Sequence, residues 1–202
     1  MISNDPFEKR RFTYSHVWWN DAFTDQQLDE IETHCSQLSL DEGKTVGETI
    51  DHRSSNVRFV DKNESTQYIF DTFNTVIDEL NNQFYKFDLY GYSSFQYTTY
   101  NAENLGKYDW HTDIILDHKM QDNMREQSTR KLSLVMVLNK PGIDFTGGEF
   151  QINLGSEETA TTLDMTRGKM YAFPSFIIHR VKPVLTGVRK SIVIWVEGPK
   201  FV

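Results

Sequence analysis

Residues 131–139 read KLSLVMVLN, a stretch typical of a strand that is buried on both faces. One set of alternate residues is wholly apolar, and the other set holds two valines and a single serine. The first set is Leu132, Leu134, Met136 and Leu138, and the second is Ser133, Val135 and Val137. Alternate side chains point to opposite faces of a strand, so both faces are largely apolar. We therefore expect this strand to lie inside a sandwich of two sheets.

Other short strand patterns surround this stretch at close spacing. Turn-forming pairs such as Gly147-Gly148, Arg167-Gly168 and Thr186-Gly187 separate them. The expected strands are Tyr92–Tyr100, Glu149–Leu154, Lys169–Phe173, Ile177–Val181 and Lys190–Val196. Many short strands divided by turns predict a jelly roll, in which two antiparallel sheets pack face to face.

The part of the chain before residue 91 has more helical character. Thr24 and Gln27 have the spacing of a capping box, which predicts the start of a helix. A second apolar stripe predicts another helix between about Ser65 and Phe84. Residues 41–55 are polar and predict a loop, and Val57–Val60 predict a short strand. The expected class is α+β, mainly β: one domain over 1–202, with a helical N-terminal part at about 1–90 and a jelly-roll core at about 91–198.

Composition excludes several classes of protein. The net charge of −8 argues against general nucleic-acid binding, because clustered Lys and Arg hold a phosphate backbone. The sequence has no run of 18 apolar residues, so no membrane span is expected, and Met1 to Arg11 does not resemble a secretory signal. Cys35 is the single cysteine, which excludes an intrachain disulfide and a cysteine-based zinc site. The cytoplasm is the simplest expected location.

The tripeptide His111-Thr112-Asp113 is the first candidate for chemistry. On an extended chain, its first and third residues can offer an imidazole nitrogen and a carboxylate oxygen to one metal ion. A polar loop with a His–Asp hydrogen bond is the alternative. His179 stands in an otherwise apolar strand, where a histidine is usually only hydrogen-bonded. Two histidines and one carboxylate are, however, the facial triad of non-haem Fe(II) oxygenases.

Arg189 and Ser191 form a second candidate pair. They have the same strand parity, so both side chains can project into one cavity. A guanidinium binds a carboxylate through two parallel hydrogen bonds, which makes Arg189 a plausible anchor for the distal carboxylate of 2-oxoglutarate. The alternative is a solvated arginine at the end of a strand.

Taken in order, these motifs resemble the 2-oxoglutarate- and Fe(II)-dependent dioxygenases of the prolyl 4-hydroxylase type over about residues 90–198. The motifs are Tyr100, Tyr108-x-x-His111-x-Asp113, Arg130, Gly147-Gly148-Glu149, Phe173-Pro174, His179-x-Val181-x-Pro183-Val184, Gly187-x-Arg189-x-Ser191 and Trp195. The resemblance implies a double-stranded β-helix (a jelly roll) that uses Fe(II), 2-oxoglutarate and O2, often with ascorbate. It implies metal ligands at His111, Asp113 and His179.

The same resemblance assigns further roles by position. Arg189, Ser191 and Tyr100 would bind 2-oxoglutarate, whereas Tyr108, Arg130 and Trp195 would contact substrate. The implied reaction hydroxylates an unactivated C–H bond, most plausibly of a prolyl residue in a peptide or protein, and releases succinate and CO2. Gly147-Gly148 is expected to form a tight bend, and Trp110 is expected to serve mainly in packing.

Two departures leave the substrate open. Arg189 stands where collagen-type prolyl hydroxylases have Lys, and Glu197 stands where plant or algal ones have His. A free amino acid or another small molecule therefore remains an alternative substrate, and a jelly-roll binding protein without catalysis is the alternative of another class. His16, His34, His52 and His118 are not expected to be ligands. Residues 117–130 are a candidate lid, and the sequence does not predict the oligomeric state.

Overall fold

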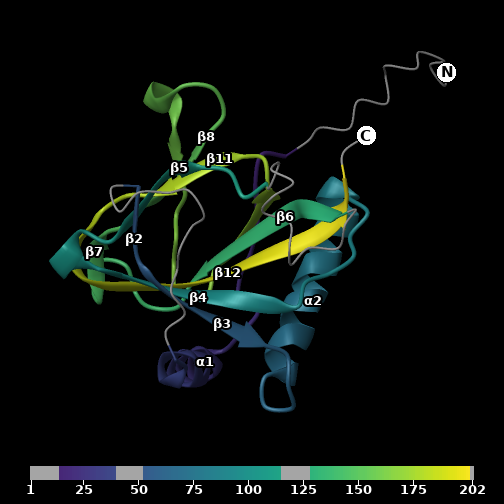
Figure 1. Ribbon diagram of the computed structural model, residues 1–202, viewed down its shortest axis with the longest axis horizontal. Helices are drawn as coiled ribbons and strands as arrows, with labels where there is room; N and C mark the ends of the chain where they lie inside the picture. Colours follow the sequence, from purple (N-terminus) through teal and green to yellow (C-terminus); the bar gives the residue numbers. More distant parts are fainter. Residues whose placement is uncertain (1–13, 40–51, 115–127, 201–202) are drawn as a thin grey trace.

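The computed structural model describes residues 14–39, 52–114 and 128–200 (Figure 1). Within these residues the strands form two sheets, a major sheet of seven strands and a minor sheet of five. The major sheet runs β1-β10-β6-β12-β4-β3, with β7 also paired to β12, and the minor sheet runs β2-β5-β11-β8-β9. All of these strand pairs are antiparallel. The jelly roll predicted from the strand spacing is confirmed.

The strands of the major sheet are β1 Val17–Trp19, β3 Asn56–Asp61, β4 Ser94–Asn101, β6 Ser128–Val137, β7 Phe145–Gly147, β10 Met170–Pro174 and β12 Val184–Pro199. Those of the minor sheet are β2 Arg53–Ser54, β5 Lys107–His111, β8 Phe150–Asn153, β9 Thr161–Thr162 and β11 Ile178–Val181. Three of the twelve strands in the described residues precede residue 91, so both sheets extend into the part of the chain that was expected to be mainly helical.

Two helices cover the outer face of the major sheet (Figure 1). Helix α1, Asp25–Gln37, begins at the predicted capping box, in which Thr24 and Gln27 satisfy each other's backbone N–H groups. Helix α2, Gln67–Leu80, continues into a π-helical turn, Asn81–Tyr85, and Lys86 then ends it with a positive φ of 55°. The capping box therefore fixes the start of α1, and the left-handed residue stops α2.

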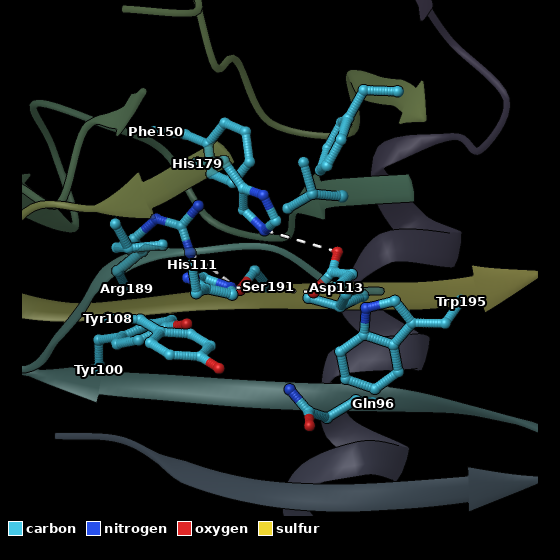
Figure 2. Close-up of a pocket in the computed structure, with 14 residues that line it drawn as sticks. Gln96, Tyr100, Tyr108, His111, Asp113, Phe150, His179, Arg189, Ser191 and Trp195 are labelled. Carbon is cyan, nitrogen blue, oxygen red and sulfur yellow. Dashed lines mark hydrogen bonds and ion pairs between the residues drawn. The ribbon is translucent and has the colours of Figure 1, made fainter. Parts of the chain in front are cut away.

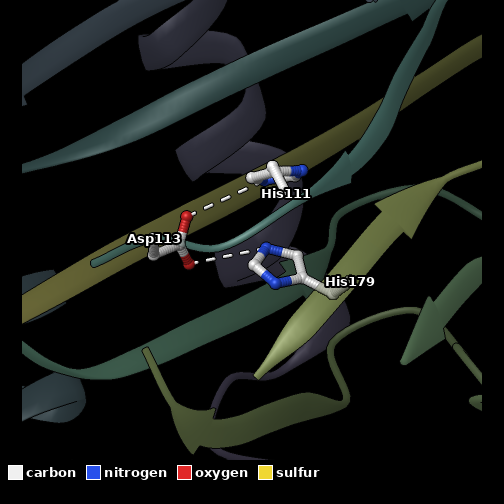
Figure 3. A group of neighbouring side chains, drawn as sticks. All are labelled: His111, Asp113 and His179. Carbon is white, nitrogen blue, oxygen red and sulfur yellow. Dashed lines mark ion pairs between the residues drawn. The ribbon is translucent and has the colours of Figure 1, made fainter. Parts of the chain in front are cut away.

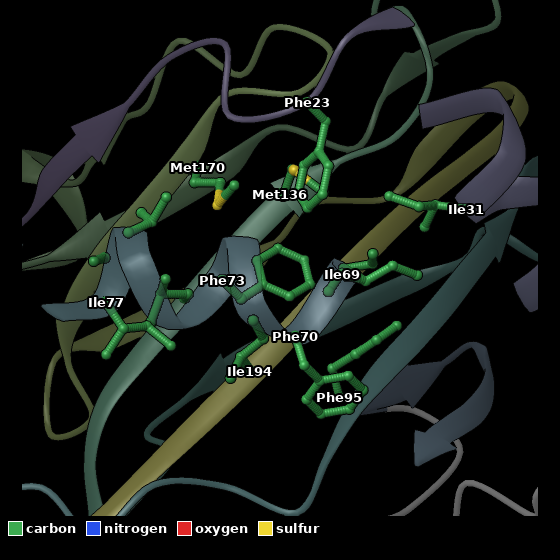
Figure 4. Close-up of a cluster of buried hydrophobic side chains, with 14 of the residues drawn as sticks. Phe23, Ile31, Ile69, Phe70, Phe73, Ile77, Phe95, Met136, Met170 and Ile194 are labelled. Carbon is green, nitrogen blue, oxygen red and sulfur yellow. The ribbon is translucent and has the colours of Figure 1, made fainter. Parts of the chain in front are cut away.

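The larger hydrophobic core lies between these helices and the major sheet (Figure 4). Phe70 and Phe73 of α2 pack on Phe95 of β4, with ring centroids 5.4 and 5.7 Å apart. The smaller core lies between the two sheets and includes Val135 of β6 and Phe150 of β8. Strand β6 contributes alternate side chains to the two cores, as its doubly apolar pattern predicted. The smaller core forms the base on which the functional pocket is built.

Three expectations need correction. Thr186-Gly187 does not separate two strands, because β12 runs through it and Gly187 adopts a φ of 70° within the strand. Arg53 and Ser54, expected in a loop, pair with β5 as β2. Ser128 to Arg130, expected in the candidate lid, belong to β6. The rest of the candidate lid, 117–127, lies outside the described residues, as do residues 41–51 of the expected loop.

Among the described helices, none has the length and apolar character to cross a membrane.

Candidate metal centre and pocket

His111, Asp113 and His179 meet at one point between the two sheets (Figure 3). His111 ends β5 and pairs directly with His179 of β11, and Asp113 follows two residues after the strand. Their candidate ligand atoms lie within 4.8 Å of one another. Nε2 of His111 is 3.8 Å from Oδ1 of Asp113, and Nε2 of His179 is 3.5 Å from Oδ2. In the described part of the chain, no other group of three His, Cys, Asp or Glu side chains is placed to hold an ion.

Backbone carbonyls orient both imidazoles. Nδ1 of His111 lies 2.7 Å from the carbonyl oxygen of Asp109, and Nδ1 of His179 lies 2.8 Å from that of Ile177. A carbonyl can only accept, so Nδ1 of each ring donates to it and Nε2 is the nitrogen that faces Asp113. Burial, with a further contribution from His179, lowers the pKa of His111 to about 3. His111 therefore presents a neutral nitrogen, the form that binds a metal.

The low pKa of His111 predicts acid sensitivity of the metal-free fold. The folded pKa of about 3 lies below the ordinary value of 6.5, so between these values the unfolded chain binds a proton that the folded chain does not. Stability from this group is complete above about pH 6.5 and falls as the pH drops, by up to about 1.4 kcal/mol per unit. Urea unfolding at pH 7, 6 and 5 should show a steeper loss in the wild type than in His111→Gln. Parallel curves would contradict this expectation.

Asp113 is ionised and fixed in place. Its backbone N–H donates to the carbonyl of Ser175 at 2.9 Å. Burial alone would raise the pKa of the carboxyl, but His179 and His111, with smaller contributions from Arg130 and Ser133, hold it below its usual value. Its Oδ2 is buried, and no hydrogen-bond donor among the described residues reaches it. A buried charged oxygen without a donor fits a position that a cation completes.

Arg189 and Ser191 lie in the same pocket as these three residues (Figure 2). The pocket has an empty volume of about 390 Å³, including its open mouth. Arg189 is 1% exposed, and its Nη1 donates to Oγ of Ser191 at 2.9 Å. Its Nε and Nη2 are buried and have no partner among the described residues. The Tyr100 ring lies beside the guanidinium, 5.4 Å from Cζ to centroid. This arrangement is a buried cation with donors available for an anionic group.

Gly148 makes room for Arg189. A Cβ atom at Gly148 would lie 2.9 Å from Cδ of Arg189 and 3.0 Å from Cγ2 of Val184, and the φ of 64° disfavours any side chain. Gly148→Ala should therefore shift the guanidinium. It should weaken binding of the expected ligand, 2-oxoglutarate, about tenfold and lower stability by about 1–3 kcal/mol. Isothermal titration and urea unfolding would measure the two effects. Gly155→Ala, where a Cβ meets nothing within 4 Å, is the control and should change neither.

A β-bulge in β5 brings Tyr108 onto the face that carries the metal ligands. His111 pairs with His179 and Tyr108 with Val181, so three steps along β5 match two along β11. Residues three apart in a regular strand point to opposite faces, but the extra residue returns Tyr108 to the side of His111. The two rings stack, with centroids 3.5 Å apart. Arg53 of β2 covers the Tyr108 ring, with Cζ 4.5 Å from the centroid.

A second bulge acts on Arg130 in β6. Between Leu132 and Arg130, β6 has one residue more than the facing part of β12. Leu132 packs toward the helices, and the bulge turns Arg130 to the other face of the sheet. There its Cζ lies 3.9 Å from the centroid of the Trp195 ring, and its Nη1 lies 3.5 Å from the carbonyl oxygen of Asp113. Two of the three side chains that the resemblance assigned to substrate, Tyr108 and Arg130, thus owe their orientation to bulges.

The structure brings all nine sequence-derived candidates together. Eight of them line the pocket or its mouth, namely His111, Asp113, His179, Arg189, Ser191, Tyr100, Tyr108 and Trp195, and Arg130 stacks on the last of these. Sequence reasoning missed Gln96, which lines the pocket, and Arg53. Gln96 has the strand parity of Tyr100, a signal that would have identified it. Trp110, expected to serve in packing, lies against Arg180, with Cζ 4.2 Å from the ring centroid.

Comparison with known sequences agrees with this geometry. Residues 95–197, which span half of the chain and hold all nine candidates, match the family model described as the 2OG-Fe(II) oxygenase superfamily. This chain belongs to the 2OG-Fe(II) oxygenase superfamily. A PKHD-type hydroxylase from Psychrobacter sp. (strain PRwf-1) is 31% identical over 100 residues, 49% of this oxygenase and 37% of that relative. The matched part therefore spans well under half the length of that relative.

Solved structures share the fold of this oxygenase. A Pseudomonas putida prolyl-4-hydroxylase superposes with a TM-score of 0.70 at 16% identity, covering 93% of this chain and 95% of that one. A prolyl hydroxylase from Trichoplax adhaerens, crystallised with a peptide fragment of the hypoxia inducible factor oxygen degradation domain, gives 0.68 at 16% identity, covering 90% and 83%. The architecture is thus that of prolyl 4-hydroxylase-type oxygenases.

The donor set fits Fe(II). Nε2 of His111 faces Oδ1 of the Asp113 carboxylate, and Nε2 of His179 faces Oδ2, which no hydrogen-bond donor among the described residues reaches. Imidazole and carboxylate together are the ligand types of the 2-His-1-carboxylate triad, which leaves coordination positions open for other molecules. The pocket that holds these three residues also holds the guanidinium of Arg189 (Figure 2).

Proposed function

We propose that this chain is an Fe(II)- and 2-oxoglutarate-dependent dioxygenase that hydroxylates an unactivated C–H bond. His111, Asp113 and His179 hold the metal in this proposal. One pocket carries this proposal, because it holds both groups that the reaction needs. Three candidate ligand atoms lie within 4.8 Å of one another there, and the buried Arg189 guanidinium has two nitrogens without a partner among the described residues. Bound Fe(II) supplies O2 activation, coupled to conversion of 2-oxoglutarate to succinate and CO2.

The protein's own residues bind and orient the co-substrate. Nε and Nη2 of Arg189 are free to donate to the distal carboxylate of 2-oxoglutarate, and Ser191 lies beside them. Tyr100 closes one side of this anchor. Phe150 and Phe173 line the same pocket and keep water from the charged groups, which strengthens the electrostatic contacts.

A prolyl residue of a peptide or protein is the substrate we infer. Tyr108 and Trp195 provide aromatic surface against which a pyrrolidine ring can pack. The indole Nε1 of Trp195 is buried without a partner among the described residues, and the Arg130 guanidinium lies beside the ring. These donors suit the carbonyl oxygens of a peptide backbone. The prolyl hydroxylase from Trichoplax, which was crystallised with a peptide, supports this inference by analogy of fold.

Turnover of labelled 2-oxoglutarate with a panel of proline-containing peptides tests the proposal. Peptide-stimulated succinate and a product heavier by one oxygen atom are the expected results. If hydroxylated product forms from free proline or another small molecule but from no peptide, the protein is a small-molecule hydroxylase. No succinate from any substrate, with Fe(II) present, would contradict the dioxygenase itself.

Two arginines that each stack on a tryptophan provide a matched pair for the substrate assignment. Arg130 lies 3.9 Å from the Trp195 ring on the pocket side, and Arg180 lies 4.2 Å from the Trp110 ring, with hydrogen bonds to Gln151 and Glu157. Arg130→Ala should raise the peptide KM at least tenfold, because it removes a charged donor worth about 1.5 kcal/mol or more. Arg180→Ala should leave the peptide KM unchanged. Equal effects of the two variants would contradict the assignment of Arg130.

A further inference from the structure

Arg53 of β2 lies on the same face of the minor sheet as the candidate metal ligands. It pairs directly with Tyr108 of β5, and residues directly opposite each other on neighbouring strands point to the same side of a sheet. The bulge in β5 places Tyr108 on the side of His111, so Arg53 shares that side. Tyr108 lines the pocket and β2 is the edge strand of this sheet, so Arg53 lies at the border of the pocket.

The Tyr108 ring separates Arg53 from His111. His111 stacks on one face of this ring, with centroids 3.5 Å apart and planes inclined by 15°. The Arg53 guanidinium covers the ring with Cζ 4.5 Å from the centroid, and the opposite face is the one left to it. The guanidinium therefore lies one aromatic ring away from a metal ligand. A neighbouring residue of a bound peptide can span this gap, because an extended chain advances about 3.3–3.6 Å per residue.

The guanidinium of Arg53 is held in place but has no anionic partner. Its Nε donates to Oγ of Ser55 at 2.7 Å, which fixes the plane of the group. Its Nη2 is buried without a hydrogen-bond partner, and no carboxylate in the described part of the chain forms an ion pair with it. Among the described arginines, only Arg53 and Arg189 have a buried guanidinium nitrogen in this state. A ligand carboxylate would satisfy such a cation.

Arg53 and Arg130 place positive charge on two sides of the pocket. Arg53 stacks on Tyr108 of the minor sheet, and Arg130 stacks on Trp195 of the major sheet, with Cζ 3.9 Å from the ring centroid. These two rings line the pocket and are the surfaces proposed to hold the prolyl ring. The whole chain has a net charge of −8, so this border differs in sign from the protein as a whole. Cations arranged in this way favour an anionic ligand at the mouth of the pocket.

We propose that Arg53 binds a carboxylate side chain of the substrate, an Asp or Glu within about two residues of the hydroxylated proline. The inference rests on the proposed function, in which a prolyl peptide occupies the pocket. Arg53 offers this carboxylate charge-assisted hydrogen bonds, and Tyr108 keeps the guanidinium beside the pocket. Arg53 determines specificity and takes no part in the chemistry, because the Tyr108 ring lies between it and His111. The substrates are therefore acidic prolyl peptides.

A set of peptides with blocked ends tests this contact apart from turnover. Each peptide has one proline among glycine and serine residues, an acetyl and an amide end, and a single Glu or Gln at one of the two positions before or after the proline. Anaerobic isothermal titration into the protein loaded with Fe(II) and 2-oxoglutarate measures binding, because the reaction requires O2. At one position or more, the Glu peptide should bind about tenfold more tightly than the Gln peptide, the effect of a charge-assisted hydrogen bond. Added salt should reduce this preference.

Variants of Arg53 connect the preference to this side chain. Arg53→Gln should abolish the preference for Glu and leave the affinity for the Gln peptide unchanged. Arg53→Lys keeps the charge but not the planar guanidinium, so it should keep a smaller preference. In succinate assays, Arg53→Gln should raise KM for the Glu peptide about tenfold and leave kcat unchanged, because Arg53 does not touch the reacting atoms.

Arg58 provides the matched control. Its Nε also donates to an oxygen, the carbonyl of Leu38 at 2.8 Å, and its Cζ lies 5.8 Å from the centroid of a tyrosine ring. That ring belongs to Tyr97, which packs in the larger core, so Arg58 lies on the helix-facing side of the major sheet. Arg58→Gln should therefore keep the full preference for the Glu peptide.

The outcomes separate this inference from the proposed function. A wild type that binds these peptides without preferring Glu at any position would refute the role of Arg53 and leave the peptide substrate intact, and this comparison needs no variant to fold. A preference that survives in Arg53→Gln would refute it as well. Equal losses of affinity for the Glu and Gln peptides would show that Arg53 only supports Tyr108, which contradicts the inference. A wild type that binds no peptide would refute the peptide substrate itself, and this inference with it.

Discussion

Asp113→Asn is expected to reduce 2-oxoglutarate turnover by about a thousandfold or more. Asparagine keeps the shape of the side chain but replaces the charged oxygen that lies 3.5 Å from Nε2 of His179 with a neutral group. The loss of a charged ligand removes several kcal/mol of metal interaction, and about 4 kcal/mol corresponds to a thousandfold. Succinate release and the metal content of the purified protein measure the two consequences together.

The fold should survive this substitution, which makes the result interpretable. Asp113 is buried beside His111 and His179, and asparagine introduces no buried charge. Asp61→Asn, an exposed carboxyl at the end of β3, is the matched control and should keep full turnover and metal content. If Asp113→Asn retained both turnover and metal, the assignment of the metal centre would be wrong even though the jelly-roll fold is correct.

The sequence predicted those features that depend on local periodicity. The doubly apolar stretch at 131–139 predicted a strand between two layers, and β6 contributes to both cores. The capping box at Thr24 predicted the start of α1. His111 and His179 could be grouped because a histidine in an apolar strand is conspicuous, although only the paired strands show that the two residues are directly opposite.

Features that depend on register between distant strands were not predictable. The bulges that direct Tyr108 and Arg130 toward the pocket arise from one extra residue relative to a partner strand, which no local pattern records. Gly187 looks like a turn residue, but a Cβ there would lie 2.0 Å from the carbonyl oxygen of Asp144. It permits a close approach of β7 while β12 continues, so close packing between strands explains this glycine.

Arg189→Met is expected to weaken 2-oxoglutarate binding at least a hundredfold and to stabilise the protein in the absence of 2-oxoglutarate. The two effects have one cause, a guanidinium that is 1% exposed with Nε and Nη2 unpaired among the described residues. An uncompensated buried cation destabilises the fold, and methionine removes it while filling much of the same space. The substitution also removes two charge-assisted hydrogen bonds to 2-oxoglutarate, each worth about 1.5 kcal/mol or more.

Arg189→Lys separates charge from geometry. Lysine keeps the positive charge but has no planar fork, so it cannot bind a carboxylate through two parallel hydrogen bonds. We expect an intermediate loss of 2-oxoglutarate affinity, about tenfold. Thermal unfolding with and without 2-oxoglutarate, in the presence of a redox-inert divalent cation, measures both properties, since a ligand that binds only the folded state raises Tm.

Arg167 provides the opposite case in the same molecule. Its guanidinium is fully engaged: Nε donates to the carbonyl of Leu138 at 2.7 Å, Nη1 contacts Asp25 at 3.0 Å, and Nη2 binds Asp29. Arg167→Met should therefore lower stability and leave 2-oxoglutarate affinity unchanged, the reverse of Arg189→Met. If Arg189→Met instead lowered Tm and kept its affinity, the buried guanidinium would be a structural element of the core, and the co-substrate would have to be anchored elsewhere.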